Sequence, residues 1–174
     1  MSSDRAVYRS THPDVLKIWN DYDATAEEWQ ERINAFLAEH GFTGRNVHFN
    51  TTTNSIYGVK HDDGEVPAGW RIDRKYGYLV PRLTSKAGKV IDAQLGELRR
   101  PDPREMVPGM PKNCLAGRHF MTCAMRSMAG AIYVTWPRPI PESQVDLSIW
   151  ERVKLSEYYA VVEAEEAAGE ARDV

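Results

Sequence analysis

The sequence is short of cysteine, of long hydrophobic runs and of secretory features. Its two cysteines, Cys114 and Cys123, are too few to build a disulfide framework. No apolar stretch approaches the ~20 residues that a membrane-spanning helix needs. The first five residues also lack the apolar segment of a secretory signal. From these absences we expect a cytoplasmic protein that makes no contact with a membrane.

The common cofactor and nucleotide motifs are missing as well. The chain has no glycine-rich dinucleotide loop, no phosphate-binding Gly-Lys-Ser/Thr, no paired-cysteine zinc spacing, no His-Glu-x-x-His and no nucleophile elbow. We therefore expect no cofactor, and the sequence leaves open whether the protein is an enzyme. Cys114, His119 and Cys123 are three potential zinc ligands, but no second closely spaced ligand pair accompanies them. This spacing favours buried free thiols over a metal site.

Composition and charge describe an ordinary globular chain with an uneven charge distribution. Its 174 residues are 42% hydrophobic and 27% charged, which predicts one domain over residues 1–174. The net charge is −3, yet residues 71–138 carry 13 Lys and Arg against 5 Asp and Glu, a net of +8. Clustered cations concentrate anions around them, so this segment predicts an anionic partner. The alternative is that the charges scatter over different faces once the chain folds.

A helical segment opens the predicted architecture, within residues 1–44. Apolar residues recur at alternating spacings of four and three between Val15 and Phe36, which predicts an amphipathic helix from about Pro13 to His40. Thr25 begins a capping-box pattern that would divide this helix into two. The narrow apolar seam also allows the helix to form a homodimer.

Strands dominate the middle segment, residues 45–141, and a helix with an acidic tail occupies residues 142–174. We predict strands over 47–51, 55–59, 70–73, 78–80, 119–123 and 131–136, a central helix from Thr84 or Ser85 to about Leu98, a proline-rich loop over 101–117, and a last helix that begins near Asp146 or Ser148. The fold class is α+β, with an antiparallel sheet of short strands packed against the long N-terminal helix, the central helix and the C-terminal helix.

The candidate binding residues are the cations of the basic segment, together with aromatic residues between them that could stack on bases. The cations are Arg71, Arg74, Lys75, Arg82, Lys86, Lys89, Arg99, Arg100, Arg104, Arg118 and Arg126; the stacking candidates are Trp70, Tyr76 and Tyr78. We therefore predict a non-catalytic binding protein whose basic central face engages a nucleotide, a nucleic acid or an acidic protein surface. The pI near 6.0 argues against the nucleic acid more than against a small ligand.

Two other functions remain open. The tetrads that begin at His48 and His119 resemble each other, and two histidines on neighbouring strands could act as general base and acid of a phosphoester hydrolase or transferase, with arginines holding the phosphate. Against this, residues three apart on a strand point to opposite faces, so His48 and Thr51 would not share a pocket. The second alternative is a protein-protein interaction or inhibitor module that uses the N-terminal helix.

Overall fold

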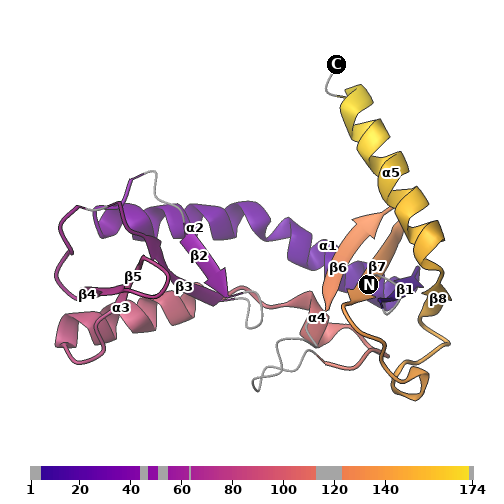
Figure 1. Ribbon diagram of the computed structural model, residues 1–174, viewed down its shortest axis with the longest axis horizontal. Coiled ribbons are helices and arrows are strands. Elements are labelled where there is room, and N and C mark those ends of the chain that lie inside the picture. The colour runs from indigo at the N-terminus through magenta and orange to yellow at the C-terminus, as the bar shows by residue number, and fades with distance from the viewer. Residues whose placement is uncertain (1–4, 44–46, 51–54, 63, 113–122, 173–174) are drawn as a thin grey trace. The chain divides into compact units, whose positions relative to one another are not determined.

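The computed structural model describes residues 5–43, 47–50, 55–62, 64–112 and 123–172 (Figure 1). The chain forms two compact units: the first comprises Met1–Asp23 and Asp102–Val174, and the second comprises Ala24–Pro101. Each unit has a four-stranded antiparallel sheet and helices of its own. This confirms the predicted α+β class, with the strands divided between two sheets.

The first unit is built around a sheet with the strand order β6-β7-β1-β8. Its strands are β1 (Ala6–Ser10), β6 (Ala124–Met128), β7 (Ala131–Trp136) and β8 (Glu151–Val153). Its helices are α1 (Pro13–Ala24), α4 (Pro103–Met106), a 3-10 turn (Glu142–Gln144) and α5 (Leu155–Arg172). Tyr8 of β1 packs into one apolar cluster with Trp136 and Trp150, whereas its neighbour Val7 packs into another with Tyr158. The central strand β1 is therefore buried on both faces.

Three predictions for the first unit need correction. The strands β1 and β6 were not predicted, because buried and exposed residues do not alternate regularly in either of them. The last helix begins at Leu155, not near Asp146, because Asp146 accepts hydrogen bonds from Ser148 in a turn and Glu151–Val153 pair with β1. The proline-rich loop contains α4, whose N-cap is Asp102; Pro103 fits the first turn of a helix, where its missing N–H costs nothing. The predicted strand 119–123 lies outside the described residues except for Cys123.

The second unit has a sheet with the strand order β2-β3-β5-β4 and two helices. The strands are β2 (Val47–Asn50), β3 (Ser55–Lys60), β4 (Trp70–Asp73) and β5 (Tyr78–Pro81), and the helices are α2 (Ala26–Glu39) and α3 (Lys86–Glu97). Phe36 of α2, Ile91 of α3 and Leu79 of β5 meet in one apolar core. The helices α2 and α3 therefore cover one face of the sheet, and no helix of this unit covers the other face within the described residues.

Most predictions for the second unit are confirmed. The strands lie where the sequence placed them, and the Ser85 hydroxyl caps α3 by accepting the Gly88 N–H at 3.0 Å. The predicted first helix is divided at Thr25 into α1 and α2. Thr25 has helical backbone angles (φ −88°, ψ −3°) instead of the extended angles of a capping residue, and its hydroxyl accepts a hydrogen bond from Arg100 without capping α2.

Candidate functional site

An irregularity in the β2–β3 ladder determines which side chains face outward in the second unit. His48 pairs with Gly58 and Phe49 pairs with Ile56, so β3 has one extra residue, Tyr57, opposite this step. A bulge of this kind breaks the strict alternation of side chains along a strand. Ile56 and Val59 are both buried in the core, although they are three residues apart. Tyr57 and Gly58 between them therefore lie on the face that the helices do not cover.

The pairing across the rest of the sheet extends this uncovered face. Gly58 lies opposite His48 on β2, Tyr78 lies opposite both Lys60 and Asp73, and Arg71 lies opposite Val80. Since paired residues in an antiparallel sheet share a face, their side chains line one surface. We call this surface the outer face; it carries His48, Tyr57, Lys60, Arg71, Asp73 and Tyr78, together with Arg74, Lys75 and Tyr76 from the β4–β5 turn.

Aromatic rings form a continuous cluster on the outer face. The His48 ring stacks on the Tyr78 ring, with centroids 4.4 Å apart and planes inclined by 16°. These residues lie on β2 and β5, with β3 between them, and Gly58 of β3 has no side chain to separate them. Tyr57 meets His48 edge-on at 5.6 Å and Tyr76 edge-on at 6.4 Å. Tyr76 is 57% exposed, so the cluster offers at least one open ring to a ligand.

A hydrogen bond fixes the central tyrosine. The Tyr57 hydroxyl donates to the Asp73 carboxylate, so its side chain spans β5 from β3 to β4. This bond raises the pKa of Tyr57 above its ordinary value, and it lowers the pKa of Asp73. Asp73 also accepts the backbone N–H of Lys75 at 2.9 Å, which orders the β4–β5 turn. The aromatic cluster is thereby held in place before any ligand arrives.

Three exposed cations border the aromatic cluster. Arg71, Arg74 and Lys75 are exposed, and the Lys75 ammonium lies 5.1 Å from the centroid of the Tyr76 ring. Within the described part of the chain, none of the three forms a salt bridge with a carboxylate. Their charges are therefore available to an anionic ligand beside the rings.

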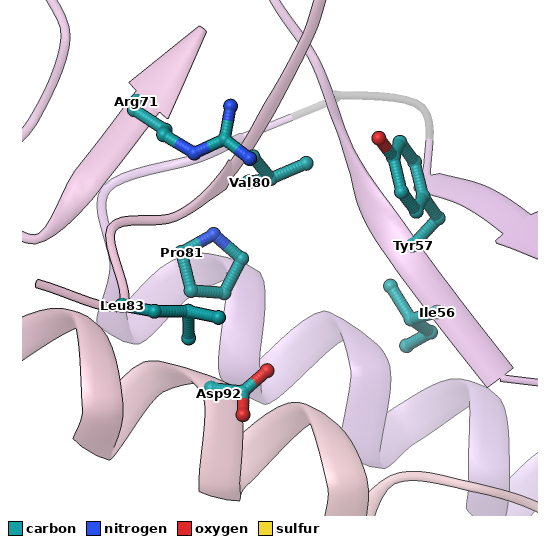
Figure 2. Close-up of a pocket in the computed structure, with 7 residues that line it drawn as sticks. All are labelled: Ile56, Tyr57, Arg71, Val80, Pro81, Leu83 and Asp92. Atoms are coloured by element: carbon teal, nitrogen blue, oxygen red, sulfur yellow. The ribbon is translucent and has the colours of Figure 1, made fainter. Parts of the chain in front are cut away.

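A pocket opens where β3 and β5 separate (Figure 2). These strands pair at Val59–Leu79 and Lys60–Tyr78, and the remaining residues of both strands leave the ladder. The pocket has a volume of about 240 Å³. It is lined by residues of β3, β4, β5, α3 and the connection between β5 and α3, namely Ile56, Tyr57, Arg71, Val80, Pro81, Leu83 and Asp92.

Two predicted binding residues, Trp70 and Arg100, are buried. Trp70 is 2% exposed and its ring packs against the rings of Phe36, His40 and Phe42, so it belongs to the core and not to the outer face. Arg100 is buried, and its guanidinium lies 5.4 Å from the Trp29 ring centroid.

The remaining predicted cations belong to both units of the chain. Arg82, Lys86 and Lys89 are exposed around the first turn of α3, and Arg99 is exposed just after that helix. Arg104 and Arg126 belong to the first unit, where Arg104 is bound to the buried Asp102 carboxylate at 2.9 Å. Arg118 lies outside the described residues. The basic segment of the sequence is thus divided between the two units.

The histidine and cysteine predictions fall mostly outside the described residues. Cys114 and His119 lie there, so the paired-histidine site and the three-ligand set are not described. Cys123 is buried, and burial raises the pKa of its thiol to about 12. Over the ranges that the structure describes, no group of three or more His, Cys, Asp and Glu side chains is arranged to hold a metal ion.

Four polar or charged residues of the outer face and the pocket were not predicted from the sequence, namely Tyr57, Lys60, Asp73 and Asp92. Regular alternation from the buried Val59 places Tyr57 in the core, and only the bulge turns it outward. His48 was singled out as a catalytic residue, whereas in the structure its ring is part of the aromatic cluster. No feature of the sequence marked Asp92 as a binding residue, because carboxylates are common at exposed positions of helices.

No family model, no curated protein and no solved structure matches this chain. Among the described helices, none combines the length and the apolar character needed to cross a membrane.

Proposed function

We propose that the second unit binds single-stranded nucleic acid on its outer face. The observation that carries this proposal is the aromatic cluster of His48, Tyr57, Tyr76 and Tyr78, bordered by exposed cations. Proteins that hold single strands combine aromatic side chains on which bases stack with cations that follow the phosphates. Both components occur here on one sheet face, and this refines the anionic partner predicted from the sequence.

Single strands suit this face better than a duplex does. In a duplex each base is stacked on its neighbours, whereas an unpaired base can turn its flat face to an aromatic ring. Tyr76 offers such a ring beside Lys75 at the tip of the β4–β5 turn. Arg71 and Arg74 are close along the same chain segment and can contact the phosphates that follow the stacked base.

Fluorescence anisotropy with labelled oligothymidine and oligouridine of about 12 nucleotides tests the proposal. We expect binding at low salt that weakens as salt rises. If Arg71, Arg74 and Lys75 each neutralise one phosphate, a plot of log K against log salt has a slope of about −2. The variant Tyr76→Ala loses one stacking platform and should bind about tenfold more weakly.

Tyr159→Ala is the matched control, because Tyr159 is also an exposed tyrosine, 41% accessible, but lies on α5 of the first unit. It should bind oligonucleotides as tightly as the unaltered protein. Equal losses in the two variants, or the absence of binding at low salt, would contradict the proposal. The phosphoester hydrolase and the interaction module are not proposed, since no observation on the described residues favours either one.

A further inference from the structure

We propose that the pocket between β3 and β5 selects a guanine base, an inference that rests on the proposed binding of single strands. Tyr57 and Arg71 belong both to the outer face and to the pocket wall. A strand held on the outer face therefore passes the pocket mouth, and one of its bases can enter while its neighbours stay on the aromatic cluster.

The pocket has the size and the walls for one base. Pockets that enclose drug-sized ligands span roughly 300–1,000 Å³, and this pocket, at about 240 Å³, suits a single ring system. Ile56, Val80, Pro81 and Leu83 give it apolar walls that suit the faces of a planar ring (Figure 2).

The polar groups of the pocket favour guanine over the other bases. Asp92 lines it from α3 and Arg71 from β4, and Figure 2 shows them on opposite sides of Pro81. An ionised carboxylate only accepts hydrogen bonds, whereas a guanidinium only donates them. Guanine presents adjacent N–H donors at N1 and N2 and adjacent acceptors at O6 and N7, which complement these two groups. Adenine, cytosine and thymine each place an acceptor directly beside their N–H donor, so a carboxylate meets repulsion next to its hydrogen bond.

Four labelled oligonucleotides test the inference: oligothymidine, and the same strand with one central dG, dA or dC. We expect the unaltered protein to prefer dG over dA by about tenfold, as one bidentate contact allows. In Asp92→Asn the ratio of the two affinities should fall to near one, because the amide also donates and tolerates adenine. Asp92 is exposed, so its replacement leaves the core intact. Glu31→Gln, which removes one exposed carboxylate of α2 away from the pocket, should keep the preference.

The possible outcomes separate this inference from the proposed function. Equal affinity for all four oligonucleotides, or a preference that survives Asp92→Asn, overturns the guanine pocket and leaves the binding of single strands standing. No binding to any of them overturns both. Guanosine monophosphate serves as competitor in a further arm. If it displaces the dG strand at the strand's own concentration, the guanine site stands but its ligand is a free nucleotide.

Discussion

Replacement of a glycine of α3 by alanine should have opposite effects on stability at Gly88 and at Gly96. A methyl group on Gly88 would lie 1.8 Å from the Arg82 carbonyl oxygen, 2.4 Å from its carbon and 2.8 Å from the Arg82 nitrogen. All three contacts are with backbone atoms, which cannot rotate away as a side chain can. A methyl group on Gly96 would meet nothing within 4 Å. Gly88→Ala should therefore destabilise the protein and Gly96→Ala should stabilise it.

The magnitudes follow from the contacts. Gly88→Ala gains about 1 kcal/mol of helix propensity, but overpacking costs about 1–3 kcal/mol and sometimes more. Moving α3 away from Arg82 also weakens the cap in which Ser85 accepts the Gly88 N–H, a contribution of about 1 kcal/mol. We expect a net loss of about 2 kcal/mol in the free energy of unfolding. Gly96→Ala lies near the helix end, where the gain should be about 0.5 kcal/mol.

Thermal unfolding followed by circular dichroism measures both variants against the unaltered chain. For a chain of this size 1 kcal/mol shifts the Tm by about 2–4 °C, so Gly88→Ala should unfold about 4–8 °C lower and Gly96→Ala about 1–2 °C higher. If Gly88→Ala unfolded at the same temperature as Gly96→Ala, the close approach of α3 to Arg82 would not exist in solution.

Three further predictions concern the outer face and the buried thiol. A methyl group on Gly58 would lie 2.5 Å from the Leu79 carbonyl oxygen, so Gly58→Ala should cost about 1–3 kcal/mol in urea unfolding and weaken oligonucleotide binding; unchanged values for both would contradict the bulge geometry. Asp73 has a pKa below the ordinary 3.8, so it stabilises the fold above pH 3.8 and this contribution disappears as pH falls through its lower folded value. In Tyr57→Phe the Asp73 pKa, measured by NMR titration, should rise toward 3.8, and no change would exclude the hydrogen bond. Iodoacetamide should label Cys123 only after unfolding, because its thiol pKa is about 12 in the fold; rapid labelling of the folded chain, located by mass spectrometry, would contradict this.

The helices and strands of the second unit could be predicted from local patterns in the sequence. Strand-forming residues on both sides of Arg74–Gly77 predicted the β4–β5 hairpin, and Gly77 at the end of its turn has a positive φ of 74°. The Ser85 cap and the apolar period from Ile91 to Leu95 predicted α3. These features depend on residues close together in the chain, so they can be read without knowing the fold.

The first unit depends on pairings between distant residues, and there prediction failed more often. Glu151–Val153 read as the continuation of a capped helix, but they form a strand because β1, more than 140 positions earlier, presents Val7 and Arg9 to pair with them. Arg9 then binds Glu151 at 3.0 Å and Glu157 at 3.1 Å, which joins β8 and the start of α5 to the same strand. The local sequence of Glu151–Val153 indicated a helix, but the pairing with the distant strand β1 makes this segment a strand.

The candidate site shows why a cluster of charges in the sequence does not predict a cluster of charges on the surface of the fold. Arg100 and Arg104 are four residues apart in the basic segment, yet one covers Trp29 in the second unit and the other holds the buried Asp102 in the first. The aromatic cluster of the outer face depends instead on one extra residue in β3, because the bulge turns Tyr57 outward. Without the bulge at Tyr57, this tyrosine would point into the core beside Val59, the hydrogen bond to Asp73 could not form, and the pocket would lose one wall. Deleting one residue from β3 would therefore remove the proposed site more completely than deleting any of the cations around it.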